Sequence, residues 1–315
     1  MKSSAKVKKR ALSPGAFLVD ELKRRWQLYL MLVLPLAYLI IFCYVPMGGV
    51  IIAFKDYSIR GGIWGSDWVG FKHFINFFNT PDFFKLLRNT LILSLYNLVI
   101  TFPMPIILAL AVNELKSKAY KKVVQMVTYL PYFISTVVLV GTMKNIFSPR
   151  TGLINNIIAL FGGPQTDFMG NPDLFRTMYV WSGVWQGMGY SAVIYIAALA
   201  NVDSAQVEAS LMDGAGRFAR VWHVDLPAIL PTIVIQLILA VGSVMSLGYE
   251  KVFLMQNPVN TEVSEVISTF VYKRGIAGFQ YSYAAAVGLF NSVVNLVLIA
   301  LANVFAKKVG ETSLW

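Results

Sequence analysis

The sequence predicts an all-α integral membrane protein with six transmembrane helices. Of its 315 residues, 57% are hydrophobic and only 14% are charged, whereas soluble domains carry roughly a quarter charged residues. So many apolar side chains cannot all be enclosed in a core surrounded by water. Six apolar runs account for the excess, and each is longer than the ~20 residues that a helix needs to cross a bilayer.

Residues 1–26 form a basic segment that could be taken for the start of a secretory signal peptide. The apolar run that follows covers residues 27–54. It is too long for a signal-peptide core of ~7–15 residues and lacks a clear small-residue cleavage site. We therefore expect an uncleaved first membrane helix, with Pro35 and Pro46 as points where it bends.

The five further runs cover residues 87–112, 123–147, 175–200, 226–248 and 283–305. Prolines at 103, 105 and 131 interrupt two of them, so we expect bent helices there. Residues 27–306 then form one six-helix membrane domain, and residues 307–315 form a short tail.

The positive charges predict the orientation of these helices. Sixteen of the 27 Lys and Arg residues fall in the N-terminal segment, the loop at 116–122, the loop at about 202–226 and the C-terminal tail. Segments rich in Lys and Arg face the cytoplasm. Both termini and these two loops are therefore expected in the cytoplasm, and the loops at 55–85, 148–174 and 250–282 outside. We interpret the outer aromatic residues as anchors at the lipid headgroups, with contact to an external partner protein as the alternative: Trp64, Trp68, Phe71, Phe74, Phe77 and Phe78.

The cytoplasmic loop at about 202–226 has the local signals of a helical elbow. Asp203 is a good N-cap, and residues 205–212 after it contain no helix breaker. Gly214 can end that helix because glycine adopts the left-handed conformation without steric cost. Pro227 suits the first turn of the next helix, where its missing N–H is not needed.

This elbow resembles the EAA loop of binding-protein-dependent ATP-binding cassette (ABC) importers. That loop reads Glu-Ala-Ala, then Gly, and later an apolar residue, any residue, Leu and Pro. The corresponding residues here are Glu208, Ala209, Ser210, Gly214, Val224, Leu226 and Pro227, and Asp213 and Ala215 match the common Asp-Gly-Ala form. Ser210 for Ala and Val224 for Ile are mild departures.

The resemblance implies a type I ABC importer permease in a bacterial cytoplasmic membrane. It implies four kinds of protein or ligand partner: a second, similar permease, two ATPase subunits that dock on the elbow, an external solute-binding protein and the transported solute. Membrane lipid would surround the chain. We expect no catalysis and no cofactor in this chain, because it has no Gly-x-x-x-x-Gly-Lys-Ser/Thr phosphate loop. ATP and Mg²⁺ would belong to the partner ATPase.

The other chemical signals are few. Cys43 is the only cysteine, so neither an internal disulfide nor a cysteine metal site is expected. His73 and His223 fall on opposite sides of the expected membrane and cannot share a metal. The net charge of +11 follows the membrane orientation, and we expect no nucleic-acid partner.

A glycine- and aromatic-rich stretch at 181–190 is the best candidate for substrate contact. Aromatic rings stack on sugar rings, and an amide hydrogen-bonds hydroxyls. Trp185, Gly187 and Tyr190 resemble the substrate-contacting helix of the maltose importer's larger permease subunit, whereas Gln186 replaces an apolar residue there. Gln186 and Tyr190 share a helix face that Trp185 flanks. Glu250 and Asn291 are weaker candidates.

The resemblance extends over nearly the whole chain after the basic segment. The stretches 248–258, 266–272, 288–292 and 310–315 look like a subgroup that imports oligosaccharides derived from polysaccharides. The alternative solutes are an amino acid, a polyol or phosphate. An ion-coupled secondary transporter would need ionisable groups inside its helices, which are almost absent here. A membrane-embedded enzyme would need paired acids, metal ligands or a nucleophile with its base, and the sequence suggests none.

Overall fold

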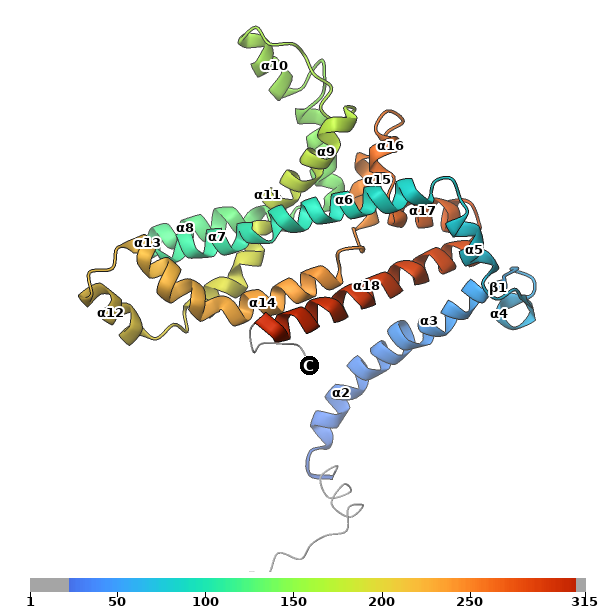
Figure 1. The fold of residues 1–315 in the computed structure, drawn as a ribbon, viewed down its shortest axis with the longest axis horizontal. Coiled ribbons are helices and arrows are strands. Elements are labelled where there is room, and N and C mark those ends of the chain that lie inside the picture. Colours follow the sequence, from blue (N-terminus) through green and yellow to red (C-terminus); the bar gives the residue numbers. More distant parts are fainter. Residues whose placement is uncertain (1–22, 310–315) are drawn as a thin grey trace, which may run out of the picture.

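The computed structural model of this chain describes residues 23–309. In that range the chain is almost wholly helical, and long helices lie side by side in a bundle (Figure 1). A two-stranded antiparallel sheet, β1 (Lys55–Asp56) with β2 (Asp67–Trp68), follows the first long helix. Parts of two predicted segments, residues 1–22 of the basic segment and 310–315 of the tail, lie outside the described residues.

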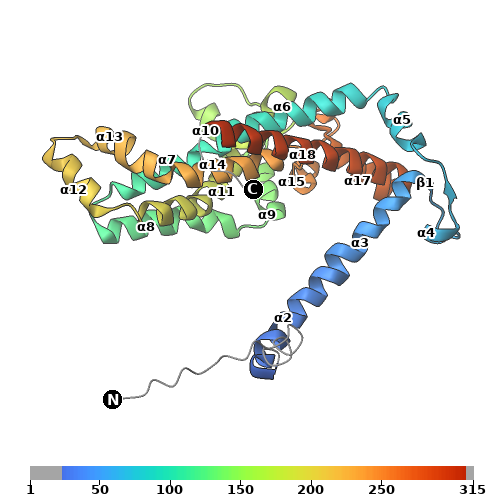
Figure 2. The same ribbon diagram turned by 60° about the horizontal axis from the view of Figure 1, so that its bottom comes forward.

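The first membrane helix stands apart from the bundle (Figure 2). It consists of α2 (Trp26–Tyr38), a π-helical segment (Leu39–Tyr44), α3 (Val45–Met47) and a 3₁₀ segment (Gly48–Phe54). No residue in its most apolar stretch is buried within this chain. Only its outer end packs against the bundle, where Ala53 is buried beside α18 (Tyr281–Val309).

A π turn precedes a proline at two places in the fold. The Val45 N–H bonds the Ile40 carbonyl just before Pro46, and the Leu226 N–H bonds the Val221 carbonyl just before Pro227. A proline has no N–H to donate, and its ring clashes with the carbonyl four residues back. The wider turn relieves that clash, so each helix continues past its proline.

The outer segment after the first helix carries α4 (Gly62–Gly65) and α5 (Lys72–Phe78). The aromatic residues there do not form one interfacial set. Phe77 is fully buried in the core beside Phe270 and Phe290, whereas Trp68 is 63% exposed and stacks on Phe54. The interpretation of Phe77 as a membrane anchor is therefore wrong, because a core position is available to it.

The next predicted run forms α6 (Phe83–Thr101) and α7 (Pro103–Asn113), which together make one continuous span. The run predicted over 123–147 is a broken pair. It comprises α8 (Lys118–Tyr129) with a 3₁₀ turn (Leu130–Phe133), and then α9 (Thr136–Ile146), which turns away by 97°. The Ser135 hydroxyl accepts a hydrogen bond from Val138 and so starts a new helix. The short α10 (Leu153–Leu160) follows within the loop predicted to lie outside, and α11 (Pro172–Leu199) returns through the bundle.

The second half of the chain begins with the elbow, α12 (Ser204–Met212) and α13 (Arg217–Arg220). A π segment (Val221–Asp225) leads into α14 (Leu226–Gly242). This helix ends six residues before the predicted end at 248. Residues 250–282, predicted as a loop, form α15 (Tyr249–Met255), α16 (Thr261–Ser264), α17 (Ile267–Tyr272) and a π segment (Lys273–Ala277) before α18.

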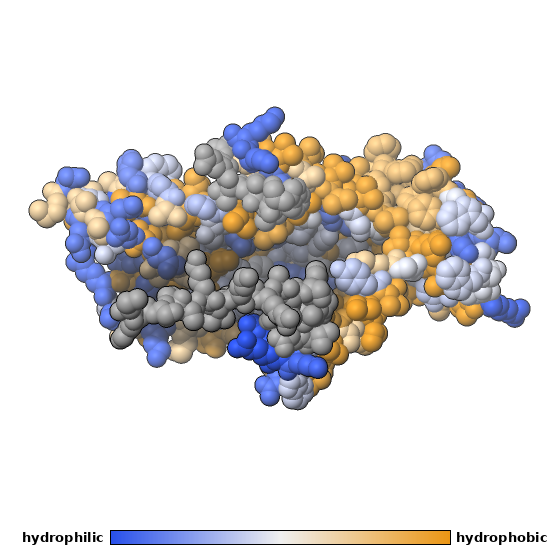
Figure 3. All heavy atoms as spheres, turned by 90° about the horizontal axis from the view of Figure 1, so that it is seen from below, coloured by the Kyte–Doolittle hydropathy of each residue, from blue (hydrophilic) through white to orange (hydrophobic). Residues whose placement is uncertain are grey.

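Four helices in the described range are long and apolar enough to span a membrane, and the bent pair of α8 and α9 would make a fifth span. The long helix α11 carries Trp, Tyr, Gln and Gly and is not among them. The structure thus shows a helical membrane protein without confirming the count of six. Apolar side chains cover much of the surface between more hydrophilic ends (Figure 3).

The buried core is divided along the bundle. One cluster joins α6, α9, α11 and α15, a second joins α5, α6, α17 and α18, and a third joins α7, α11 and α14. Helices α6 and α11 each contribute to two of these clusters and so connect the three parts of the core.

Candidate functional site

The elbow lies at one end of the bundle (Figure 1). The Asp203 carboxylate accepts a hydrogen bond of 2.9 Å from the Ala205 N–H, which starts α12 as predicted. Gly214 has φ +76°, and an added Cβ would meet no atom within 4 Å. Glycine is therefore required there by the left-handed backbone and not by lack of space.

The predicted coupling residues occupy an exposed helix and its turn. Glu208 and Ala209 are exposed on α12, and Asp213 follows its last residue. The Ser210 hydroxyl donates to the Val207 carbonyl at 2.7 Å, and the Ala215 N–H donates to the Ser210 carbonyl at 2.9 Å. These two hydrogen bonds join residues of α12 to one another and to the turn that follows, so they stabilise the local conformation of the elbow.

The elbow presents apolar side chains that no residue in the described range 23–309 covers. Met212 is 88% exposed and Phe218 is 93% exposed, with Leu211 and Trp222 also more than half exposed. No residue of α12 is buried. An exposed apolar group of this size beside polar residues is typical of a protein interface.

The base of the elbow is tied to the bundle. Arg220 forms an ion pair with Glu114, which follows α7, and its Nε lies 3.9 Å from the buried Asp225 carboxylate. Leu226 packs against the cluster of α7, α11 and α14, while Pro227 is exposed. The elbow is therefore joined to α7 and α14 by an ion pair and by apolar packing.

A second candidate site is a cavity of about 790 Å³ between α6, α11 and α14. Tyr179 and Tyr190 of α11 line it. Polar side chains from three other segments also line it: Ser94, Asn97, Gln236, Ser243 and Ser246. The Ser94 hydroxyl is buried and has no hydrogen-bond partner in the described residues. A cavity of this size, with polar groups set among apolar ones, suits a small polar ligand.

Tyr190 and Gln186 lie on the same side of α11, as their spacing predicts. Tyr190 is 48% exposed, and its ring stacks on Tyr132 with centroids 4.0 Å apart. The Gln186 amide donates to the Ile134 carbonyl at 2.7 Å, so it closes the break between α8 and α9. Tyr190 therefore faces the cavity, while the Gln186 amide is committed to the neighbouring backbone.

The other candidates lie elsewhere. Trp185 lines a separate apolar cavity of about 450 Å³ between α9 and α11. Glu250 is exposed at the start of α15. It forms no ion pair with Lys251, which donates to the Tyr179 carbonyl, or with Lys273, which pairs with Glu265. The structure thus does not bring Trp185 or Glu250 to the cavity that Tyr190 lines.

Asn291 supports an irregular stretch of backbone, residues 243–248, between α14 and α15. Its amide donates to the Met245 carbonyl at 3.2 Å. One turn further on, the Asn295 carbonyl accepts from the Met245 N–H at 3.0 Å, and its amide donates to the Ser246 hydroxyl at 2.7 Å. Non-helical backbone at membrane depth persists only where protein encloses it or it lines a cavity, and this stretch does both.

Several cavity residues were not assigned from the sequence. Asn97 and Gln236 were recognisable only as polar residues inside apolar runs, and Ser243 and Ser246 fell within a run predicted to be helical. The available signal was the polar residues themselves, since such groups inside a membrane helix face a cavity or a partner helix. Which of the two applies depends on packing between distant segments.

Comparisons with known proteins give one consistent result. The sequence profile of a family described as "Binding-protein-dependent transport system inner membrane component" matches residues 84–311. Protein LplB of Bacillus subtilis (strain 168) is 48% identical over 294 residues, which cover 93% of this chain and 92% of the relative. The polygalacturonan/rhamnogalacturonan transport system permease protein YteP of the same organism is 45% identical and covers 95% of this chain and 93% of its own.

A solved structure agrees with the sequence comparisons. A chain of a bacterial ABC transporter involved in the import of the acidic polysaccharide alginate superposes with a TM-score of 0.85 at 38% identity. The match covers 93% of this chain and 99% of that one.

Proposed function

Since this chain belongs to the family of binding-protein-dependent transport system inner membrane components, we propose that it forms half of the pathway of an ATP-driven oligosaccharide importer. The chain is a permease subunit and carries out no ATP hydrolysis itself. The oligosaccharide would be delivered by an external binding protein, as in the relative solved with a pentasaccharide-bound periplasmic protein.

The observation that carries this proposal is the cavity of about 790 Å³ between α6, α11 and α14. Its hydroxyl and amide groups can exchange hydrogen bonds with sugar hydroxyls, and the Tyr190 ring offers a face on which a sugar ring can stack. The cavity borders the irregular backbone at 243–248. A small change in that backbone would alter the polar lining without disrupting a regular helix.

We assign ATPase coupling to the elbow. Its apolar side chains Met212 and Phe218 are exposed and unmatched in this chain, and its base is tied to α7 and α14 through Glu114 and Leu226. Closure of two ATPase subunits would then move two bundle helices as rigid elements. The residues proposed for this contact are Glu208, Ala209, Ser210, Asp213, Gly214, Ala215, Leu226 and Pro227.

The finer architecture is part of the same proposal. Six crossings, with α11 as one and the bent pair of α8 and α9 as another, place both termini and the elbow in the cytoplasm of a bacterium. The complex would contain a second, homologous permease of different sequence and two ATPase subunits, with ATP and Mg²⁺ bound only by the latter. The exposed apolar surface of α2 and α3 is consistent with lipid or partner contact.

The alternative solutes are less favoured. Two of the relatives compared above are named for the transport of polygalacturonan/rhamnogalacturonan and of alginate. A polyol, an amino acid or phosphate would leave much of a cavity of about 790 Å³ unfilled. An ion-coupled transporter is opposed by the family membership itself.

The test is reconstitution of the co-purified complex in proteoliposomes with its binding protein. We expect uptake of an oligosaccharide only when ATP and the ATPase subunits are present. Uptake driven by an ion gradient without ATP would contradict the proposal. Isolation in mild detergent should recover one further permease and the ATPase together with this chain.

A further inference from the structure

The positive side chains of the outer half differ in whether they have a carboxylate partner. Lys72, Lys85 and Lys273 pair with Asp56, Asp82 and Glu265 at 3.0, 2.9 and 2.6 Å. Arg176 and Lys251 form no ion pair among the residues that the structure describes. Asp173 and Glu250, the carboxylates nearest to them in sequence, are exposed and likewise unpaired in that range.

Lys251 projects from α15 onto the central helix α11. Its Nζ donates to the Tyr179 carbonyl at 2.9 Å and lies 4.8 Å from the centre of the Tyr179 ring. Gly183 leaves room for it, since an added Cβ there would lie 3.2 Å from Nζ. A lysine ammonium has three donors, so two remain for a further acceptor. Burial lowers the pKa of Lys251 to about 8, which reflects the cost of holding this charge without a counter-charge.

Arg176 lies on the same face of α11. It is seven residues before Gly183, which is about 10 Å along the helix axis and about 20° around it. Its Nη2 donates to the Asn89 side-chain carbonyl at 3.4 Å, while its Nε is buried without a partner in the described residues. An orphaned buried donor on a charged group is costly unless a ligand meets it.

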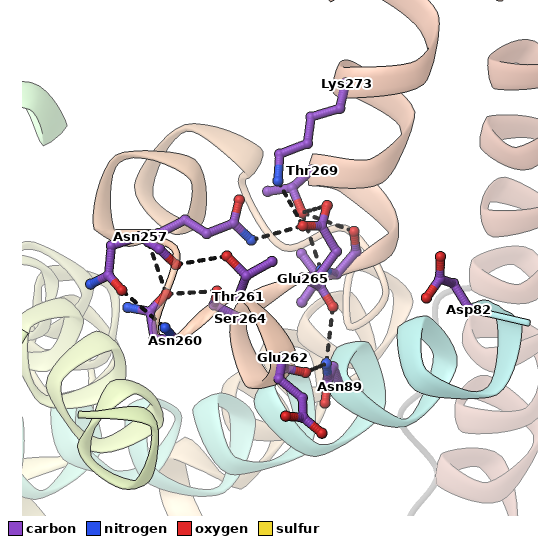
Figure 4. Close-up of polar contacts among 12 residues, drawn as sticks. Asp82, Asn89, Asn257, Asn260, Thr261, Glu262, Ser264, Glu265, Thr269 and Lys273 are labelled. Atoms are coloured by element: carbon purple, nitrogen blue, oxygen red, sulfur yellow. Dashed lines mark hydrogen bonds and ion pairs between the residues drawn. The ribbon is translucent and has the colours of Figure 1, made fainter. Parts of the chain in front are cut away.

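Asn89, the partner of Arg176, belongs to a polar network that joins α6 to residues 262–265 (Figure 4). The Asn89 amide donates to the backbone carbonyls of Glu262 and Glu265 at 2.7 and 3.2 Å. Its side-chain carbonyl is thereby turned toward Arg176. The Glu265 carboxylate is already occupied by Lys273 and Thr269 and is not free to neutralise the arginine.

The stripe of Arg176, Tyr179 and Gly183 leads along α11 into the cavity. Tyr179 lines that cavity, as do Leu247 and Gly248 just before α15. Tyr190 continues the same face, fourteen residues after Arg176. Neither Arg176 nor Lys251 lines the cavity itself. Lys251 contacts Tyr179, which does line it, and Arg176 lies about one helical turn before Tyr179, so the two cations border one end of the cavity.

We propose that Arg176 and Lys251 bind carboxylate groups of the transported oligosaccharide, so that this permease selects acidic, uronate-containing chains over neutral ones. This inference rests on the proposed function as an oligosaccharide importer. A carboxylate has acceptors for the orphaned arginine Nε and for the free lysine donors. Two separate contacts of this kind can recognise the carboxylates along an oligosaccharide. They still allow its release, because each contact is broken in turn.

The test compares free acids with their neutral methyl esters. Proteoliposomes containing the complete complex and its binding protein are given trimers of galacturonate or mannuronate, each as the acid and as the ester. The quantity measured is the ratio of acid to ester uptake. Any preference of the binding protein is common to all variants, so it cancels when their ratios are compared.

We expect the wild-type complex to prefer the acid. Lys251→Gln and Arg176→Gln should each lower the acid-to-ester ratio by about tenfold, the scale of a charge-assisted hydrogen bond, and Lys251→Arg should retain most of it. Lys72→Gln, which removes a cation already paired with Asp56, is the matched control and should leave the ratio unchanged.

Results that contradict this inference can be told apart from results that contradict the proposed function. If the wild type imports esters as well as acids, or if both Gln variants assemble and keep the wild-type ratio, the carboxylate contact is wrong. A complex that imports only neutral oligosaccharides would overturn this inference and leave the proposed function standing. A complex that imports no oligosaccharide at all would overturn both.

Discussion

Gly214 is the residue in the elbow at which backbone geometry is most demanding. Its φ of +76° lies in the left-handed region, and the space around it is open. Gly214→Val should therefore cost about 1–3 kcal/mol in local strain and misplace α12. We predict that the purified complex keeps its subunits and loses stimulation of ATP hydrolysis by the loaded binding protein.

Gly216 provides the matched control for this substitution. It lies two residues away in the same turn, has φ −70°, and an added Cβ would meet no atom within 4 Å. Gly216→Ala should leave stimulated ATP hydrolysis close to that of the wild type. Normal stimulation in Gly214→Val would show that the left-handed turn is not needed for coupling.

Tyr190 is the cavity residue with the clearest aromatic role. Its stacking on Tyr132 fixes the ring at the cavity wall. Tyr190→Ala should slow oligosaccharide uptake, because an aromatic contact contributes about 0.5–1.5 kcal/mol. Tyr190→Phe should preserve most of the rate. Uptake by Tyr190→Ala equal to that of Leu296→Ala, a change on an exposed face of α18, would exclude a substrate contact.

At the scale of single residues, the structural role of a residue could be predicted when its neighbours in sequence determine that role. Asp203 as a helix cap and Gly214 as a left-handed turn were predictable, because each follows from its immediate neighbours. Trp185 and Tyr190 are only five residues apart, yet they line different cavities. Helix geometry gives the angle between two side chains, but the choice of which direction faces a cavity comes from α6, α9 and α14.

At the scale of elements, prolines were useful signals whose effect differed with context. Pro46 and Pro227 each follow a π turn and leave the helix continuous. Pro131 precedes the break at which α9 turns by 97°. The capping residue Ser135 marks that break in the sequence, whereas the size of the bend depends on the Gln186 contact with Ile134 from α11.

The end of α14 is also determined by contacts between distant segments, which the sequence pattern does not reveal. The apolar run continues to 248, and the helix stops at Gly242 because Asn291 and Asn295 of α18 bind the backbone and Ser246 beyond it. These contacts join residues about 50 positions apart in the chain. A sequence pattern read in short windows does not contain them.

Asn295→Leu tests how much the hydrogen bonds between α18 and residues 245–246 contribute to stability. It leaves the buried Met245 N–H without its acceptor and removes the bond to Ser246. Polar contacts between membrane helices contribute about 0.6–2 kcal/mol, so the thermal unfolding midpoint of the detergent-purified complex should fall by a few degrees. Ser292→Ala on the same helix loses only an exposed bond to Gly288 and should leave the midpoint unchanged. Equal midpoints for the two variants would mean that the Asn295 hydrogen bonds contribute nothing to the stability of the complex.

For the molecule as a whole, composition and the resemblance of the elbow predicted the class of protein, and the comparisons confirmed it. Burial in the first helix could not be predicted, because a membrane-spanning run looks the same whether it packs against its own chain or not. In this chain the most apolar part of the stretch from Trp26 to Phe54 is unburied. We therefore expect it to contact lipid or a partner subunit.

The orientation of the whole molecule can be tested at two exposed positions. Phe161 follows α10 in the outer loop and is 87% exposed, and Phe218 in the elbow is 93% exposed. Single cysteines at these sites, in a Cys43→Ser background because Cys43 is itself exposed, report the side of the membrane. The positive charges near the elbow predict that it lies in the cytoplasm, so an impermeant thiol reagent applied to intact cells should label Phe161→Cys and spare Phe218→Cys.

Phe161→Cys also decides how many times the chain crosses. It lies between the bent pair of α8 and α9 and the polar helix α11, the two elements whose spanning is not evident from length and apolarity alone. If both cross, Phe161 and Phe218 face opposite sides and the count is six. If neither crosses, both cysteines react only after the cells are opened, and four spans remain. Labelling of both positions from outside would instead reverse the charge argument, because the elbow would then lie away from the cytoplasm.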